Sequence, residues 1–449
     1  MGRLFGTDGV RGIAGVDLTP ELALALASAA VHELVVRRDD AERPRVVIGR
    51  DTRPSGEWLE AAVTAGCLAA GADVDVIGII PTPGVAYTVA TTGADLGVMI
   101  SASHNPMPDN GIKFFARGGH KLADDVEDRI EARLPVEMSR PVGEAVGRRY
   151  DERGAAHRDS YVAHLLTSVT TPLDGLRVVV DCANGAASTV APDAYRTAGA
   201  DVVVINDDLS GYRINDGCGA THLEAVQNAV REHNADVGLA HDGDADRCIA
   251  VDANGDVVDG DAILAILALA LQERGQLASD TVVTTVMTNL GFKRAMATHG
   301  VAVAETPVGD RYVLEEMRAR NLVLGGEQSG HLILLSHSTT GDGLLTGLQL
   351  LARMAETGRS LAELAGVLRR LPQVLLAVRV QDKAAALDAP AVIDAIAAAE
   401  ASLGADGRIL VRPSGTEPVV RVMVEAPEEA IAQSIAERVA TAVQTASDS

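Results

Sequence analysis

The sequence is poor in aromatic residues and in cysteine, and both shortages limit what the protein can be. Phe, Tyr and Trp make up 2% of the 449 residues, so the hydrophobic cores must consist mainly of Ala, Val, Leu and Ile. With 47% hydrophobic residues, this composition favours alternating strands and helices over an all-β sandwich. The cysteines are far apart and form no Cys-x-x-Cys pair, which argues against a disulfide framework and indicates a reducing compartment. They are Cys67, Cys182, Cys218 and Cys248.

Long hydrophobic runs and excess positive charge are also missing. The longest apolar run, residues 262–271, is too short to span a bilayer, which takes about 20 residues. The N-terminal residues contain no apolar signal core, so we expect a soluble, cytoplasmic protein with no membrane partner. The net charge of −23 would repel nucleic acid. A small anionic substrate is compatible with this charge if Arg and Lys converge in a cleft.

Strand-length apolar runs alternate with helical patterns along most of the chain, which predicts mostly parallel sheets with helices on both faces. Single helices are expected over 186–199 and 384–402. We predict an α/β protein of three similar α/β domains with mixed, mostly parallel sheets, plus a C-terminal α+β domain, around a central cleft. The expected domains are 1–150 with a serine loop, 151–247 with a metal-binding loop, 248–370 with a sugar-binding loop, and 371–449 with a phosphate-binding loop.

Three carboxylates stand at alternate positions directly after a predicted strand, in "HDGDADR" (241–247). Asp242, Asp244 and Asp246 would repel one another strongly unless a cation lay between them. Oxygen ligands favour Mg²⁺ or Ca²⁺. A calcium-binding EF-hand would need Gly and Glu where Arg247 and Ala253 stand, so that interpretation fails. The alternatives left are a magnesium site and a solvated acidic turn.

Another predicted strand ends in "SASHNPMPDNGIK" (101–113). A phosphate on Ser103 could supply one of the oxygens that Mg²⁺ takes beyond the three carboxylates. His104 and Lys113 could donate to phosphoryl oxygens or move protons, and residues 108–111 would form the turn that brings Lys113 back. The alternative is that Ser103 is only a small loop residue.

Two further loops carry groups suited to a sugar phosphate. In "RPSGTEP" (412–418), hydroxyls and a glycine lie beside guanidinium groups, which suits a dianion, although such a turn can also be purely structural. Its candidate residues are Arg412, Ser414, Gly415, Thr416 and Arg421. In "GEQSGH" (326–331), Glu327 suits sugar hydroxyls or an amine, Ser329 adds a hydroxyl, and His331 follows; a polar strand-to-strand turn is the alternative.

Taken together and in this order, "SASHNP", "DGDADR", "GEQSGH" and "RPSGTEP" resemble the motifs of the α-D-phosphohexomutase superfamily over essentially the whole chain. "FGTDGVRG" (5–12) and "VGDRYV" (308–313) resemble its bacterial branch that acts on glucosamine phosphates. The resemblance implies an isomerase that interconverts glucosamine 6-phosphate and glucosamine 1-phosphate, feeding UDP-N-acetylglucosamine and cell-wall synthesis. It also implies one Mg²⁺ ion and a phosphorylated Ser103 as covalent intermediate.

Carried over by motif, the resemblance makes Ser103 the phosphoryl donor and acceptor and places the metal on Ser103, Asp242, Asp244 and Asp246. Arg11, His104, Lys113, Arg247 and His331 would form the transfer site, with Lys113 and His331 as acid/base candidates. Glu327 and Ser329 would contact the sugar, and the 412–421 loop would hold the other phosphate. The alternatives are a phosphoglucomutase or phosphomannomutase, and a non-catalytic phosphosugar-binding protein. The expected partner is a small phosphosugar, and a homodimer is kept open.

Overall fold

The computed structural model describes residues 3–6, 8–34, 43–134, 136, 139–414 and 418–447. The chain divides into two compact units. One consists of Met1–Val286 with Val301–Val367, and the other of Met287–Gly300 with Leu368–Ser449.

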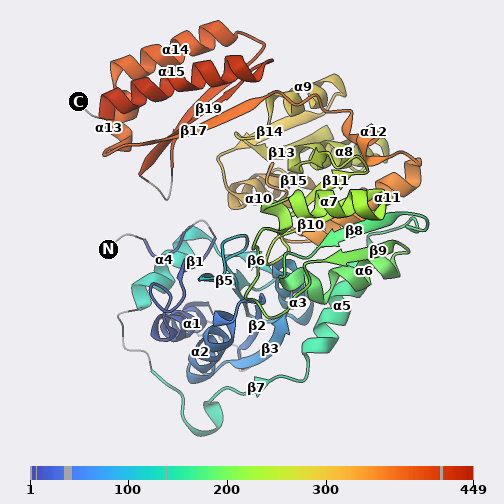
Figure 1. Cartoon of the computed structure of the whole chain (residues 1–449). Coiled ribbons are helices and arrows are strands. Elements are labelled where there is room, and N and C mark those ends of the chain that lie inside the picture. Colours follow the sequence, from blue (N-terminus) through green and yellow to red (C-terminus); the bar gives the residue numbers. More distant parts are fainter. Residues whose placement is uncertain are drawn as a thin grey trace. The chain divides into compact units, whose positions relative to one another are not determined.

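The first sheet of the larger unit has the strand order β1-β5-β4-β2-β3-β7, with β6 paired to β5. All of these strands except β4 are labelled in Figure 1. Strands β2, β3, β4 and β7 run parallel, whereas β5 is antiparallel to β1, β4 and β6. The strands are β1 (Val10–Ile13), β2 (Arg45–Arg50), β3 (Asp73–Ile79), β4 (Leu96–Ile100), β5 (Asp109–Ala116), β6 (His120–Lys121) and β7 (Arg149–Tyr150).

Helices cover both faces of this sheet because apolar side chains of each strand point alternately to either side. In β2, Val46 and Ile48 join the core that includes α1 and α2, whereas Val47 joins the core that includes α3. Helices α1 and α2 approach closely, since a Cβ on Gly66 would lie 2.4 Å from the carbonyl oxygen of Leu24. The helices and the 3₁₀ turn of this part are α1 (Pro20–Leu34), α2 (Ser55–Ala69), α3 (Thr82–Thr92), α4 (Asp124–Arg133), η1 (Gly143–Ala145) and α5 (Gly154–Thr167).

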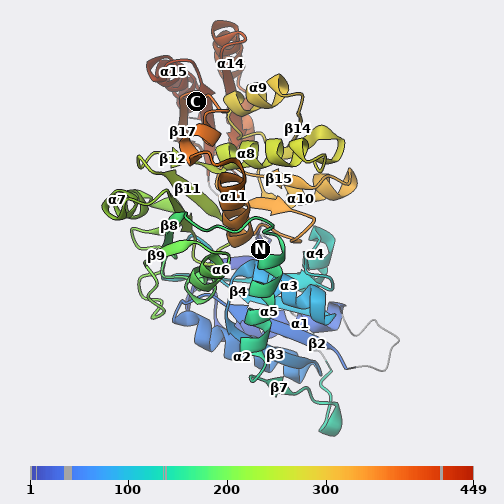
Figure 2. The same ribbon diagram turned by 90° about the vertical axis from the view of Figure 1, so that its right-hand side faces the viewer.

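The second sheet has the order β12-β11-β10-β8-β9, with β8, β9 and β10 parallel and the others antiparallel. Helix α5 packs against α3 and β3 of the first sheet region and against α6 of the second (Figure 2). The elements are β8 (Arg177–Asp181), η2 (Ala186–Thr189), α6 (Ala191–Thr197), β9 (Asp201–Ile205), η3 (Gly219–Thr221), α7 (Glu224–His233), β10 (Val237–His241), β11 (Cys248–Asp252) and β12 (Val257–Val258).

The third sheet of the larger unit has the order β14-β13-β15-β16, with β16 antiparallel to β15 and the others parallel. Helix α10 packs on one face through Val313, Leu314 and Met317. The elements are α8 (Gly260–Glu273), η4 (Ala278–Asp280), β13 (Thr281–Thr285), β14 (Ala302–Thr306), α10 (Asp310–Ala319), β15 (Leu324–Gly326), β16 (Leu332–Leu334), α11 (Gly343–Thr357) and α12 (Leu361–Ala365).

The smaller unit contains an antiparallel sheet of order β17-β19-β18. Alternate residues of β19, among them Val420, Val422 and Val424, pack against helices α14 and α15. The elements are α9 (Leu290–Thr298), β17 (Gln373–Arg379), α13 (Lys383–Asp388), α14 (Pro390–Leu403), β18 (Arg408–Pro413), β19 (Val419–Glu425) and α15 (Glu429–Ser447).

The predicted fold class is confirmed: α/β parts with mixed, largely parallel sheets are followed by an antiparallel α+β part. The predicted domain boundaries at 150, 247 and 370 stay predictions. Two expected helices are interrupted. The 384–402 helix divides at Ala389, because a residue that precedes proline disfavours the helical conformation. The 186–199 helix is interrupted at Val190, and Pro192 lies in the first turn of α6, where its missing N–H is not needed.

The loops selected from the sequence are all connections within β-hairpins. The serine loop joins β4 to β5, the "HDGDADR" loop joins β10 to β11, and the "GEQSGH" loop joins β15 to β16. The prediction that residues 108–111 form the turn before Lys113 was wrong, since β5 already begins at Asp109 and the reversal lies at 101–108. In the smaller unit, residues 414–418 connect β18 to β19.

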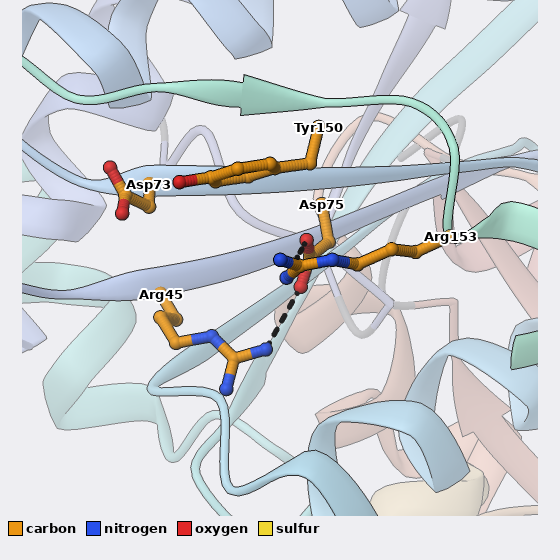
Figure 3. A pocket seen from close by; sticks show the side chains of 5 residues that line it. All are labelled: Arg45, Asp73, Asp75, Tyr150 and Arg153. Carbon is orange, nitrogen blue, oxygen red and sulfur yellow. Dashed lines mark hydrogen bonds and ion pairs between the residues drawn. The ribbon is translucent and has the colours of Figure 1, made fainter.

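A cavity of about 270 Å³ lies where β2 and β3 begin, at the opposite ends of these strands from the serine loop (Figure 3). Its buried carboxylate, Asp75, accepts hydrogen bonds from Arg45 (3.0 Å) and Arg153 (2.9 Å). The Arg153 guanidinium also lies over the Tyr150 ring, 4.4 Å from its centroid. Because Tyr150 ends β7 and Arg153 directly precedes α5, these contacts attach the connection between β7 and α5 to the sheet.

The four cysteines are free and buried, as expected from their spacing. Within the described ranges, every helix is too short or too polar to cross a bilayer.

Candidate active site

Ser103 occupies a left-handed backbone conformation at the end of a buried strand. Its φ is 53°, a value that L-residues other than Asn and Asp seldom adopt, and its side chain is 1% exposed. The Ser103 N–H donates to Ser101 Oγ (2.9 Å), and the Ser101 hydroxyl donates to Asp51 Oδ2 (2.6 Å). This chain of hydrogen bonds fixes the backbone on the amino side of Ser103.

Two buried side chains hold the carboxyl side of the same loop. Arg53 Nη2 donates to the carbonyl oxygens of Ser103 (3.1 Å) and Asn105 (2.7 Å). Asn215 Nδ2 donates to the same two oxygens, at 2.9 and 3.0 Å. We call Arg53 and Asn215 the carbonyl clamp. The carbonyl clamp could not be predicted from the sequence, because its residues are 50 and 112 positions from Ser103.

The carboxylates of Asp242, Asp244 and Asp246 come together as predicted. Each offers an oxygen, and these oxygens lie within 4.8 Å of one another; all three residues are at most 3% exposed. The Ser103 hydroxyl donates to Asp242 Oδ2 at 2.6 Å. Gly243 permits this approach, since a Cβ there would lie 2.6 Å from the Ser103 carbonyl oxygen. The solvated acidic turn is therefore the wrong interpretation.

The three carboxylates fit a divalent cation. Oδ1 of Asp244 and Oδ1 of Asp246 are buried without a hydrogen-bond partner, which is costly unless an ion occupies the space between them. Burial, followed by repulsion from Asp246 and Asp244, raises the pKa of Asp242 to about 8. A hard cation held by oxygen ligands would remove that repulsion, and Mg²⁺ and Ca²⁺ have this preference.

The predicted acid/base candidates both contact the acidic triad. The Lys113 ammonium lies 2.8 Å from Asp244 Oδ2, 2.9 Å from Asp8 Oδ2 and 3.8 Å from Asp246 Oδ2. His331 Nδ1 lies 3.5 Å from Asp246 Oδ2. Burial lowers the pKa of His331, but Asp246 outweighs it and raises the value to about 9. The pKa of Lys113 is also raised, because Asp244 and Asp8 together outweigh its burial.

The other basic residues predicted for the site, Arg11, His104 and Arg247, lie near Ser103, Asp8 and the acidic triad. Arg247 Nε is 3.9 Å from carboxylate oxygens of both Asp242 and Asp246, and it has no hydrogen-bond partner. Arg11 pairs with Asp8. His104 Nδ1 lies 3.3 Å from Ser103 Oγ, and burial together with Arg247 and Arg11 lowers the pKa of His104 to about 4. His104 is therefore neutral at pH 7.

The polar side chains of the "GEQSGH" turn lie in different surroundings from one another. Glu327 accepts a hydrogen bond from the Gly309 N–H (3.2 Å), while Ser329 is exposed. Burial, with Asp310, raises the pKa of Glu327. Gln328 Nε2 lies 3.4 Å from Asp259 Oδ2 at the start of α8. Glu327 and Ser329 thus stand on a hairpin whose last residue, His331, reaches the triad.

In the smaller unit, Arg412 and Arg421 are register partners on β18 and β19. Burial and the charge of Arg421 lower the pKa of Arg412. Two adjacent guanidinium groups of this kind suit a bound dianion. Ser414 is buried, and its carbonyl oxygen accepts a hydrogen bond from Lys383 (2.7 Å). Gly415 and Thr416 lie outside the described residues.

The fold and these loops agree with the family comparisons. Models of the four phosphoglucomutase/phosphomannomutase domains match the chain: α/β/α domain I over residues 2–140, domain II over 159–255, domain III over 259–371, and the C-terminal domain over 375–442. The chain therefore belongs to the phosphoglucomutase/phosphomannomutase family, and the resemblance seen in the motifs is confirmed.

Curated relatives show which members of the family the chain resembles. A phosphoglucosamine mutase of Saccharopolyspora erythraea is 64% identical, covering 96% of this chain and 97% of its own. A phosphoglucosamine mutase of Frankia casuarinae is 61% identical, covering 99% of both chains. Among solved structures, a phosphoglucomutase/phosphomannomutase family protein of Burkholderia thailandensis superposes with a TM-score of 0.82 at 25% identity, covering 99% and 97% of the two chains. With relatives of this kind, the chain is an isomerase of phosphosugars.

Proposed function

We propose that the chain interconverts glucosamine 6-phosphate and glucosamine 1-phosphate through a phosphorylated Ser103 and a bisphosphate intermediate. The observation that carries this proposal is the position of the Ser103 hydroxyl, 2.6 Å from Asp242 Oδ2 at the acidic triad. The names of relatives that are 61–64% identical over nearly the whole chain support the choice of glucosamine. The product would feed UDP-N-acetylglucosamine and cell-wall synthesis.

Asp242, Asp244 and Asp246, with an oxygen of phosphorylated Ser103, would hold one Mg²⁺ ion. When bound, this ion would neutralise negative charge on the phosphoryl oxygens. Arg247 and Arg11 would bind the same phosphoryl group through their guanidinium donors. His104, neutral at pH 7, would position the Ser103 oxygen.

Transfer from Ser103 forms a bond between phosphorus and a sugar oxygen and breaks the bond to Ser103 Oγ. The sugar hydroxyl must lose a proton, and Ser103 Oγ must regain one when it leaves as a hydroxyl. Lys113 and His331 flank the triad and are the residues proposed to move these protons. Because their pKa values are raised, each carries a proton that it can give to Ser103 Oγ and then recover from the sugar hydroxyl. After the bisphosphate turns end for end, the reverse steps return the second phosphate to Ser103.

The sugar and its other phosphate need separate contacts. We assign the sugar hydroxyls, or the amine, to Glu327 and Ser329. We assign the phosphate that is not transferred to Arg412, Ser414, Gly415, Thr416 and Arg421. Arg412 and Arg421 support this assignment because they lie side by side on paired strands.

The sugar preference is tested by measuring turnover of the purified protein on the 1-phosphates of glucosamine, glucose and mannose. We expect the highest kcat/KM for glucosamine 1-phosphate. Equal or better turnover of glucose 1-phosphate would instead identify a phosphoglucomutase with the same machinery.

Intact mass spectrometry with peptide mapping tests the covalent step. We expect about one phosphate per chain, located on Ser103. On incubation with isotopically labelled glucosamine 6-phosphate it should be exchanged for a labelled phosphate, because each cycle ends with transfer of the sugar's other phosphate to Ser103. Ser103→Ala should carry no phosphate and show no turnover. Sugar-phosphate binding without any phosphate on Ser103 in the wild-type protein would indicate a non-catalytic binding protein.

Replacing Asp244 tests the metal. We expect Asp244→Ala to lose Mg²⁺ binding in calorimetry and to lose turnover, with the unfolding transition retained. Asp201→Asn is the matched control, because Asp201 is an exposed carboxylate at the start of β9. Unchanged Mg²⁺ affinity in Asp244→Ala would contradict the assignment.

A further inference from the structure

Charged side chains form a closed ring beside the acidic triad. Cations and carboxylates alternate around the ring, and each residue lies within 3.8 Å of the next. The order is Lys113, Asp8, Lys121, Asp310, His331 and Asp246, and the ring closes because Asp246 also lies near Lys113. The side chains are between 3% and 20% exposed, so solvent screens them weakly. We call this set the charge ring.

One half of the ring has no place in the catalytic roles given above. Asp8, Lys121 and Asp310 form an outer arc that contacts Lys113 at one end and His331 at the other. Lys121 Nζ lies 2.6 Å from Asp8 Oδ1 and also pairs with Asp310. Asp8 Oδ2 is 2.9 Å from Lys113 Nζ, and Asp310 Oδ2 is 3.4 Å from His331 Nε2. The arc therefore connects the two acid/base candidates on the side away from the triad.

The arc also joins segments that are distant in sequence. Asp8 precedes β1, Lys121 ends the β5–β6 hairpin, and Asp310 begins α10. Asp8 and Asp310 stand in "FGTDGVRG" and "VGDRYV", two motifs of which the catalytic roles given above use only Arg11. Lys121 bridges these carboxylates in a nearly buried position, and removing it would leave the two carboxylates without the cation that they share.

We propose that Lys121 is a positioning residue which, through Asp8 and Asp310, fixes Lys113 and His331 relative to the reacting oxygens. This inference rests on the mutase activity proposed above. Lys121 itself acts through its two carboxylate partners. Its loss should therefore slow the chemical step and leave binding of the sugar phosphate nearly unchanged. Misplacing catalytic groups by about 1 Å can reduce rates roughly 100-fold.

The test uses full-length protein loaded with Mg²⁺ and phosphorylated on Ser103, with glucosamine 1-phosphate as substrate. We expect Lys121→Met to lower kcat roughly 10- to 100-fold while KM changes less than about two-fold. Lys121→Arg should recover part of kcat. Arg117→Met is the matched control, because Arg117 is a 59% exposed cation in the same hairpin and should keep wild-type kcat.

A second variant separates positioning from a general loss of stability. Asp310→Asn removes the carboxylate that links Lys121 to His331. It should give the same pattern as Lys121→Met, a lower kcat with an unchanged KM. Since both changes break one arc, the double variant should be no slower than about the slower single variant. Wild-type kcat in both single variants, a rise in KM alone, or losses that multiply in the double variant would each overturn the proposal. An inactive wild-type protein would instead overturn the proposed function.

Discussion

The backbone conformation of Ser103 allows its strain to be measured separately from its chemistry. Replacing Ser103 by Ala and by Gly removes the same hydroxyl, together with its hydrogen bond to Asp242. The two variants then differ mainly in the backbone. At a φ of 53°, an L-residue costs roughly 1–2 kcal/mol relative to the right-handed conformation, and glycine does not carry this cost.

Glycine has a cost of its own, since its unfolded chain is more flexible, by roughly 0.5–1 kcal/mol relative to alanine. Alanine at this buried position also keeps a Cβ, worth about 0.8 kcal/mol, that glycine lacks. The backbone strain roughly offsets these two costs, so the two Ser103 variants should agree in stability to within about 1 kcal/mol. The neighbouring Ala102 is buried and does not have a positive φ, so Ala102→Gly should instead destabilise the protein by about 1–2 kcal/mol.

Urea unfolding of the full-length proteins, monitored by circular dichroism, gives these differences as shifts in midpoint. Neither Ser103 variant should take up phosphate, which mass spectrometry checks on the same samples. If Ser103→Gly is less stable than Ser103→Ala by as much as Ala102→Gly destabilises the wild type, the loop does not hold residue 103 under strain.

Further predictions concern the clamp, a buried acid, the cavity and the metal. Asn215→Ala should lower kcat, because the carbonyl oxygens of Ser103 and Asn105 lose a shared donor; an unchanged steady-state kcat would argue against the clamp. Burial raises the pKa of Asp342 from 3.8 to about 6, so the stability that the protonated carboxyl contributes should be lost as pH rises from about 4 to 7. Asp342→Asn should therefore gain on the order of 2 kcal/mol relative to wild type over that range in urea unfolding, and a constant difference would refute this. Asp75→Asn should cost about 1–2 kcal/mol by urea unfolding, because Arg45 and Arg153 lose their shared carboxylate but are partly exposed; no change would show that these ion pairs do not stabilise the fold. Phosphorylated protein should bind Mg²⁺ more tightly than dephosphorylated protein in calorimetry, and equal affinities would contradict the shared site.

The sequence was sufficient for the site residues that cluster along the chain. Asp242, Asp244 and Asp246 lie within five residues, and mutual repulsion alone made a cation the natural explanation. Ser103 was recognisable because a buried strand ended in unusually polar residues. Parallel strands were also predictable, since they are continuous apolar runs such as 45–49 and 95–100.

Elements that depend on distant partners could not be found in this way. Strands β5 and β16 were missed because each is recognised mainly by its antiparallel pairing with the preceding strand. Arg53, Asn215 and Lys121 were missed for a similar reason. Each is a single polar residue in its own segment, and only the fold brings it to a carbonyl or carboxylate more than 45 positions away.

The charges of the site explain how a protein of net charge −23 can hold a phosphorylated serine. Charges beyond about 10 Å are largely screened, so the local balance decides. In the acidic triad and the charge ring, taken with Arg11 and Arg247, ionisable carboxyl groups and basic groups are equal in number, and Arg53 nearby is paired with Asp51. The carboxyl groups are Asp8, Asp242, Asp244, Asp246 and Asp310, and the basic groups are Arg11, Lys113, Lys121, Arg247 and His331. A phosphate of charge close to −2 added to this set would be uncompensated, as would Mg²⁺ added alone. Bound together they leave the balance unchanged, and for that reason we expect each to strengthen the binding of the other.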